Sequence, residues 1–156
     1  MLIPSTVDRV PHHTPPELNR AIFRRTEDHA AYFAQRPEEI ADRLRRLDRE
    51  WDTERVLESL AGTLGATGAL LALTTGRRRW LALPAVVGAF LAHHAVRGWC
   101  PPLAALRRLG VRTQHEIERE RYALKALRGD FEGACVMGGP RGRQASARAM
   151  AAVVAR

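Results

Sequence analysis

Two long apolar segments occupy the middle of the chain. The first, Ser59–Gly76, contains 18 residues without a charge, and the second, Trp80–Val96, contains 17 when histidine is counted as neutral. At about 1.5 Å per residue, each segment as a helix nearly crosses a hydrocarbon core about 30 Å thick. Only residues 77–79 separate the two segments. Because this connection is so short, the two helices must run antiparallel. The pattern predicts a transmembrane helical hairpin over residues 56–99.

A buried hairpin in a soluble protein is the alternative interpretation of the same pattern. Neither segment has a polar face, and a helix that is apolar all round needs to be enclosed by lipid or by a large core. The remaining helices predicted below carry only narrow apolar stripes. These stripes offer too little surface to enclose two such helices, so the pattern favours a membrane over a soluble core.

The segments before the hairpin alternate between proline-rich and helical patterns. Residues 1–16 contain four prolines and are expected to be an extended, disordered lead-in. Glu17–Gln35 is predicted to be a helix, and Glu38–Glu54 an amphipathic helix that lies on a neighbour or on the membrane surface, with a short coiled-coil seam as the alternative. No proline or glycine separates the second helix from the hairpin, so the two are expected to be continuous. The apolar positions of the second helix are Ile40, Leu44, Leu47 and Trp51.

The segments after the hairpin predict two juxtamembrane helices and a basic tail. Pro101 and Pro102 suit the first turn of a short helix that Gly110 ends. A capping-box pattern at Thr113 begins a second helix, which reaches about Arg128. The expected apolar sides consist of Leu103, Leu106 and Leu109 in the first helix and Ile117, Leu124 and Leu127 in the second.

The prediction for the whole chain is therefore an all-α protein with a transmembrane hairpin flanked by amphipathic helices. Its C-terminal tail is rich in Gly, Ala and Arg and is expected to be disordered, although Ser146–Val154 also suits a weak surface helix attracted to anionic lipid. The predicted segments are a lead-in (1–16), cytoplasmic helices (17–55), the hairpin (56–99), juxtamembrane helices (100–131) and the tail (132–156).

Charge and cysteine content narrow the class of protein. The chain carries 25 Lys+Arg against 17 Asp+Glu, a net charge of +8, and Lys125 is its single lysine. Most arginines lie beside acidic residues, whereas a nucleic-acid-binding protein usually gathers unpaired basic residues on one face, so no nucleic-acid partner is expected. Two cysteines make no disulfide framework or CxxC pattern. No cleavable signal peptide is expected at MLIPSTVDRV, which lacks an apolar region.

Basic residues near the hairpin predict its orientation. Eight arginines flank the terminal side of the hairpin, and three lie in its turn. Because basic residues are retained in the cytoplasm, both termini are expected there, although the compact arginine turn opposes this orientation. The terminal-side arginines are Arg43, Arg45, Arg46, Arg49, Arg55, Arg97, Arg107 and Arg108.

Small residues recur four apart in both apolar segments. Such spacing lets helices approach closely in lipid. It indicates packing within the hairpin, and alternatively homo-oligomerisation through the same surface. The candidate packing residues are Gly62, Gly65, Ala66, Ala69, Gly88 and Ala92.

Three side chains near the end of the second segment are candidates for chemistry. Cys100 is expected at the cytoplasmic interface near Arg97, where a cation and partial exposure can make a thiol reactive; the alternative is a small residue kept for packing. His93 and His94 are accessory metal-ligand candidates, but they point about 100° apart on a helix. Neither a metal site nor a catalytic residue is predicted. Cys135 is expected to be exposed in the tail.

The stretch GALLAL, the short turn that follows it and the stretch GWCPPLAALRRLG carry a family resemblance. They resemble the YgaP-like inner-membrane transmembrane domain family, whose members are small bacterial two-helix hairpins with Cys-Pro just after the second helix. The flanks DREWDTER and ERERYALKALRGDF resemble the longer proteobacterial members, so the resemblance covers roughly Pro11 to Phe131. Some members are fused to a rhodanese domain, for which this chain is too short. The resemblance implies a membrane hairpin and gives no catalytic residue.

The patterns predict a non-enzymatic, two-span membrane protein without a cofactor, and the resemblance implies that its membrane is the bacterial inner membrane. The hairpin anchors cytoplasmic helices that associate with each other or with a protein partner that the sequence does not identify. The first alternative is a thiol-relay, sulfur-relay or redox accessory protein that acts through Cys100. The second alternative is a soluble helical adaptor.

Overall fold

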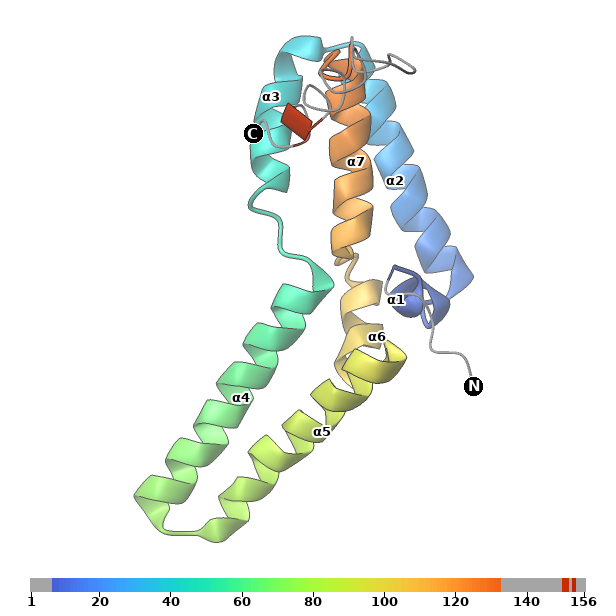
Figure 1. Cartoon of the computed structure of the whole chain (residues 1–156). Coiled ribbons are helices and arrows are strands. Elements are labelled where there is room, and N and C mark those ends of the chain that lie inside the picture. The colour runs from blue at the N-terminus through green and yellow to red at the C-terminus, as the bar shows by residue number, and fades with distance from the viewer. Residues whose placement is uncertain (1–6, 133–149, 152, 154–156) are drawn as a thin grey trace, which may run out of the picture. The chain divides into compact units, whose positions relative to one another are not determined.

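The computed structural model describes residues 7–132, 150, 151 and 153, and the described residues form helices without a strand. Two of the helices are long and apolar enough to cross a membrane. Figure 1 shows the order of the elements along the chain. The elements are α1 (Arg9–His12), α2 (Pro16–Ala34), η1 (Pro37–Glu39), α3 (Ile40–Leu47), α4 (Thr53–Thr75), η2 (Arg78–Leu81), α5 (Ala82–Arg97), α6 (Pro101–Arg108) and α7 (Gln114–Leu127).

The described chain divides into two compact units. The first contains residues 7–22 and 51–115, and therefore α1, α4, α5 and α6. The second contains residues 23–50 and 116–132, with residues 150, 151 and 153, and therefore α3 and most of α2 and α7. Each unit has an apolar core of its own.

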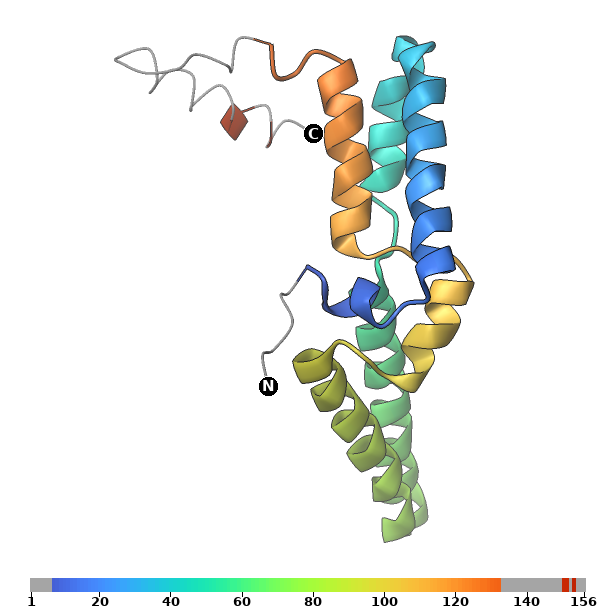
Figure 2. The ribbon, with the colours of Figure 1, turned by 90° about the vertical axis from the view of Figure 1, so that its right-hand side faces the viewer.

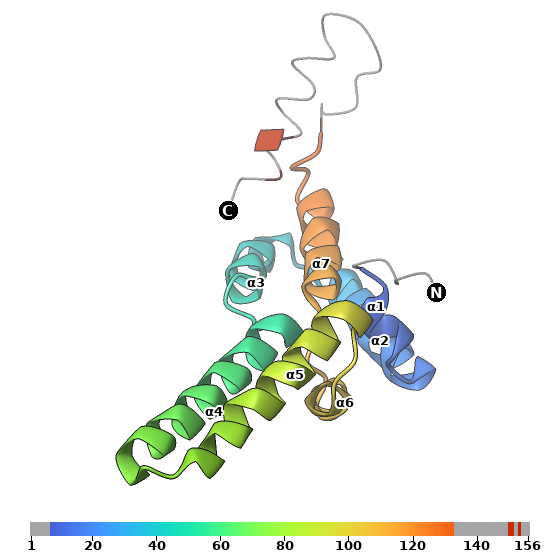
Figure 3. The ribbon, with the colours of Figure 1, turned by 60° about the horizontal axis from the view of Figure 1, so that its bottom comes forward.

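Helices α4 and α5 form an antiparallel hairpin, as Figures 1 and 3 show from two directions. Gly76 ends α4 in the left-handed region, with φ of 65°, which glycine adopts without steric cost. The two helices pack closely at Gly68, where an added Cβ would lie 2.6 Å from Cδ of Pro84. We call the end near residues 76–81 the turn end, and the end near Thr53 and Arg97 the open end.

Most of the hairpin surface is exposed. In the most apolar 18-residue window of each helix, 11% of the α4 residues and 6% of the α5 residues are buried. A core helix of a soluble protein is mostly buried, so these helices do not form an enclosed core.

The small residues predicted to pack the hairpin divide into two groups. Gly65 and Ala69 are half-buried, and a Cβ on Gly65 would contact Cβ of Pro84 at 4.0 Å. A Cβ on Gly62 or Gly88 would meet nothing within 4 Å, so the expectation that these two glycines bring the helices together is wrong. The closest approach is instead made by Gly68, a buried residue on the side of α4 that faces α5. Like Gly62 and Gly88, the predicted packing residues Ala66 and Ala92 are exposed.

The chain is not helical between α3 and α4, which corrects the expectation of one continuous helix from Glu38 into the hairpin. α3 ends at Leu47, and α4 begins at Thr53. Asp52 precedes α4 with extended backbone (φ −79°, ψ 170°), and its carboxylate accepts a hydrogen bond from Arg55 N at 2.7 Å. An N-cap residue has non-helical backbone, so the cap at Asp52 ends any continuity. Trp51, expected on an apolar face, is 53% exposed in this break.

The described part of the lead-in is ordered by local contacts, which corrects the expectation of an extended segment at residues 7–16. Val10 in α1 is 3% exposed and packs in the core of the first unit. The hydroxyl of Thr14 donates to Val10 O at 2.9 Å, and the Asn19 amide donates to Pro11 O at the same distance. Proline-rich composition did not prevent folding here because side-chain donors pair the backbone carbonyls.

The second unit packs three helical segments around one apolar core, and Figure 2 shows α3, α7 and α2 side by side. Its predicted apolar positions are buried except at the end of α7, where Leu127 is 45% exposed. Leu109, in the first unit, follows the last residue of α6 and is 80% exposed. The predictions for Cys135 and for Ser146–Val154 fall outside the described residues, apart from 150, 151 and 153. The core consists of Phe33, Ile40, Leu44, Leu47, Ile117 and Leu124.

Candidate functional site

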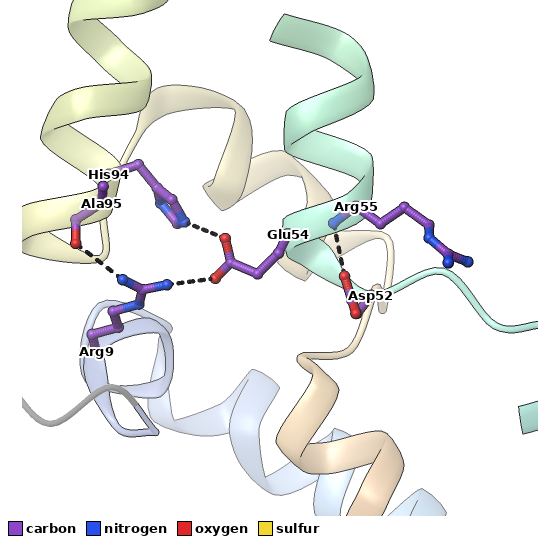
Figure 4. Close-up of polar contacts among 6 residues, drawn as sticks. All are labelled: Arg9, Asp52, Glu54, Arg55, His94 and Ala95. Atoms are coloured by element: carbon purple, nitrogen blue, oxygen red, sulfur yellow. Dashed lines mark hydrogen bonds and ion pairs between the residues drawn. The ribbon is translucent and has the colours of Figure 1, made fainter. Parts of the chain in front are cut away.

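A polar cluster joins three segments at the open end of the hairpin (Figure 4). Glu54 in the first turn of α4 accepts from Nη2 of Arg9 at 3.1 Å through one carboxylate oxygen. Its other oxygen lies 3.0 Å from Nε2 of His94, near the end of α5. Nη1 of Arg9 donates to the carbonyl of Ala95 at 3.0 Å. We call these three side chains, Arg9, Glu54 and His94, the Glu54 cluster.

Local sequence places each member of this cluster. Glu54 lies in the first turn of α4 because Asp52 caps that helix, and an acidic residue there also suits the helix dipole. α5 ends at Gly98, whose φ is 72° and whose N–H donates to His94 O at 2.7 Å. A Cβ on Gly98 would lie 2.6 Å from Cβ of Arg9, so glycine is required both for the turn and for the approach of α1.

The hydrogen bonds of the cluster define the donor on His94. A carboxylate only accepts hydrogen bonds, so Nε2 of His94 carries the proton that Glu54 accepts. His94 is 2% exposed, and its Nδ1 is buried without a hydrogen-bond partner among the described residues. The Nε2 atom of His94 therefore bridges α5 to α4, and its Nδ1 is the buried polar atom of the ring that the described residues leave without a hydrogen bond.

Cys100 lies beside this cluster in an apolar core rather than at an exposed interface. It is 3% exposed and packs with Val10, Leu57 and Leu103. Burial raises the pKa of the Cys100 thiol above its ordinary value; a backbone hydrogen bond from Leu103 lowers the pKa in part, and the charge of Glu54 raises it further. The expected partial exposure is wrong, and a buried thiol beside a carboxylate forms little of the reactive thiolate at neutral pH.

His93 and His94 point to different surroundings, as their spacing on a helix predicts. His93 is exposed, and its ring lies edge-on to Trp99 with centroids 6.0 Å apart. Among the described residues, no group of three or more His, Cys, Asp and Glu side chains is arranged to hold a metal ion. His93, His94 and Cys100 are therefore not brought together as ligands.

A buried arginine in the first unit was not recognised as such from the sequence. Arg107 is 1% exposed, and its guanidinium donates to Thr14 Oγ1, Asn19 Oδ1 and Val111 O at 3.0–3.1 Å. These bonds connect α6 to the segment around α1. In the sequence Arg107 adjoins the exposed Arg108, and no local signal separates the buried arginine from the exposed one.

The second unit contains a similar arrangement that was also missed. Glu120 on α7 is fully buried; its Oε1 lies 2.7 Å from Nε of Arg43 and 3.0 Å from Nδ1 of His29. A buried carboxylate needs such partners, because desolvation without them is costly. Glu120 occurs in the charged run ERERYALK, where only burial distinguishes it from its neighbours. Both units therefore use a glutamate held by an arginine and a histidine to join separate segments.

Comparisons of the chain with protein-family models, with curated proteins and with solved structures give no match. The functional interpretation therefore depends on the geometry described above.

Proposed function

We propose that this chain is a non-enzymatic integral membrane protein whose α4–α5 hairpin crosses a bilayer and anchors the helices that flank it. The observation that carries this proposal is the exposure of two helices that are both long and apolar enough to span. In water such an apolar surface would be unfavourable, whereas in a bilayer it is the surface that contacts lipid.

The polar groups inside α4 support a lipid environment. All four threonines of the apolar segment donate their hydroxyls to the carbonyl four residues earlier, at 2.5–2.9 Å. Each hydroxyl is thereby satisfied within the helix, as hydrocarbon surroundings require. The four donors are Thr63, Thr67, Thr74 and Thr75.

The aromatic and basic residues at the two ends of the hairpin suit the two membrane–water interfaces. Trp51 and Trp99 are exposed beside the open end, and the guanidinium of Arg55 lies 5.7 Å from the Trp51 ring centroid. At the turn end, Arg79 lies over Trp80 at the same distance. Tryptophan is enriched at the headgroup level of a bilayer.

The proposal also covers the orientation of the hairpin and the membrane in which it lies. The excess of arginines on the terminal side favours cytoplasmic termini, and residues 77–79 then lie on the far side of a bacterial inner membrane. The resemblance to YgaP-like hairpins agrees with this placement. The exposed small residues Gly62, Ala66, Gly88 and Ala92 are available for association with a second copy or with a partner helix.

Charge insertion tests the membrane proposal against a soluble adaptor. Leu70 and Val86 are 61% and 52% exposed, so a soluble protein would accept arginine at both positions. In a bilayer, arginine near the centre of a helix costs about 2.5–3.5 kcal/mol per residue. We expect the wild-type protein to stay in the pellet after an alkaline carbonate wash, and the L70R/V86R variant to lose most of its membrane-integrated fraction.

Leu109→Arg is the matched control, because Leu109 is 80% exposed and lies outside the hairpin. This variant is expected to fractionate like the wild type. Recovery of the wild type in the wash, or equal fractionation of the L70R/V86R variant and the wild type, would contradict the proposal and favour the soluble adaptor.

A further inference from the structure

An apolar groove of about 270 Å³ lies between α4 and α5 near the open end of the hairpin. The groove lies between the close contact at Gly68 and the open end of the hairpin. Cys100, Pro101 and Pro102 line the end of the groove nearest the polar cluster. The helical walls consist of Leu57, Leu60, Ala61 and Leu64 from α4 and Val86, Val87, Phe90 and Leu91 from α5.

We propose that this groove binds one acyl chain of a phospholipid, an inference that rests on the proposed membrane insertion. Within the hydrocarbon core, a space lined by leucine, valine and phenylalanine excludes water, and leaving it empty forfeits dispersion contacts on its walls. A lipid chain is the apolar molecule available at that depth.

The groove is long enough to hold part of a lipid chain. Its wall from Leu57 to Leu64 extends about 10 Å along α4. The residues that line the groove carry no charged side chain, which suits a hydrocarbon chain.

Charge at the open end suits the headgroup of the same lipid. Arg97 is exposed and continues the row of Val86 and Phe90 on α5, two turns beyond Phe90. A guanidinium at this level matches the phosphate of a lipid whose chain extends toward the turn end. Trp99 is exposed at the same end of the hairpin, as expected at the headgroup level.

Photo-crosslinking tests this site in the full-length protein. The protein is reconstituted in vesicles of phosphatidylcholine and phosphatidylglycerol that contain a trace of phosphatidylcholine with a diazirine midway along one acyl chain. After irradiation, mass spectrometry locates the labelled residues. We expect residues 57–64 and 86–91 to be labelled about threefold more per residue than residues 66–73, because a chain in a groove is contacted on several sides.

Two substitutions separate groove binding from ordinary lipid contact. Ala61→Trp fills the groove and is expected to reduce its labelling about threefold, to the level of residues 66–73. Ala85→Trp adds the same side chain at an exposed position of α5 that does not line the groove, and it is expected to leave the labelling unchanged.

Each other result overturns the inference. Equal labelling of the groove and of residues 66–73, or groove labelling that A61W does not change, indicates ordinary lipid contact. A groove that is unlabelled, in protein that resists the carbonate wash and is labelled elsewhere on both helices, shows that no lipid chain occupies the groove. Absence of label from both helices, with the protein removed by carbonate, shows that membrane insertion itself has failed.

Discussion

At the scale of single residues, the surroundings of a side chain decide its role more than its type does. Cys100 precedes two prolines and follows a basic helix end, which favours a reactive thiol at the sequence level. In the structure Cys100 has apolar neighbours and a nearby carboxylate, and both raise the pKa of its thiol instead of lowering it. The sulfur-relay alternative therefore loses the exposed thiolate on which it depended.

The first prediction is that Cys100 is alkylated slowly at neutral pH and that its alkylation rate rises only at a more alkaline pH. In a Cys135→Ser background, native protein in detergent should react with a maleimide more slowly at neutral pH than unfolded protein, because burial raises the pKa of the thiol and so lowers its thiolate fraction. The alkylation rate of Cys100 in native protein should begin to rise at a higher pH than the alkylation rate of a free cysteine does. A raised folded pKa also means that stability is present below the unfolded pKa and is lost as pH rises through the folded value. Equal native and unfolded rates would contradict the burial of this thiol.

The second prediction compares two glycines in the left-handed region. Gly98→Ala is expected to destabilise the protein by about 1–2 kcal/mol through backbone strain, with a further loss from the contact with Arg9. Gly110 has φ of 80° and open space around it, so Gly110→Ala isolates the strain. Thermal unfolding in detergent micelles, followed by circular dichroism, should give the larger decrease for Gly98→Ala. Equal effects would show that α1 does not need its close approach to Gly98.

At the scale of elements, packing of the hairpin depends on one glycine that the spacing of small residues did not single out. Gly68→Ala places a Cβ 2.6 Å from Pro84 and 3.1 Å from the carbonyl of Trp80, so the turn end must open. Gly62→Ala is the matched control, because its Cβ meets nothing within 4 Å. We expect Gly68→Ala to lower the unfolding midpoint in micelles and Gly62→Ala to leave or raise it, since alanine is the better helix former. The reverse order would contradict the contact at Gly68.

The Glu54 cluster connects α1, α4 and α5 through hydrogen bonds. The fourth prediction is that removal of the Glu54 carboxylate destabilises the protein. Glu54→Ala leaves the buried Nε2–H of His94 without an acceptor, at a cost of about 1–3 kcal/mol. Glu54→Gln keeps an acceptor for His94 and should cost less. Glu58→Ala, an exposed position one turn further along α4, should change the stability by less than about 0.5 kcal/mol. Equal unfolding midpoints for Glu54→Ala and Glu58→Ala would show that the cluster does not stabilise the open end.

Much of the helical arrangement follows from patterns that are local in the sequence. The uncharged segments, the arginine turn and the proline and glycine helix ends predict α4, α5 and α6 closely. The break before α4 was missed because Asp52 ends continuity through a side-chain bond to Arg55 N, without a proline or glycine.

The polar clusters depend on contacts between residues 40–93 positions apart, such as His94 with Glu54 and Arg107 with Thr14. One sequence does not specify such pairs. Which of several small residues faces a neighbouring helix is likewise decided by tertiary packing. For that reason Gly68 makes the close contact, whereas Gly62 and Gly88 do not.

At the scale of the whole molecule, we expect the turn end and the flanking helices to lie on opposite sides of one membrane. The chain passes between the two units at residues 22–23, 50–51 and 115–116, and none of these connections lies at the turn end. Eight arginines flank the hairpin on its terminal side and three lie at its turn, and this excess determines the expected orientation. In the proposed function, the hairpin anchors the protein and its exposed helical surfaces are available for assembly.

Cysteine accessibility tests whether the hairpin spans the bilayer. Arg78→Cys in the turn and Arg45→Cys on α3 are introduced separately in a Cys100→Ser/Cys135→Ser background, and both positions are exposed. In intact bacterial cells with a permeabilised outer membrane, a membrane-impermeant maleimide should label Arg78→Cys. It should label Arg45→Cys only after the inner membrane is opened. Labelling of both positions under the same condition would place them on one side and contradict a hairpin that spans the bilayer.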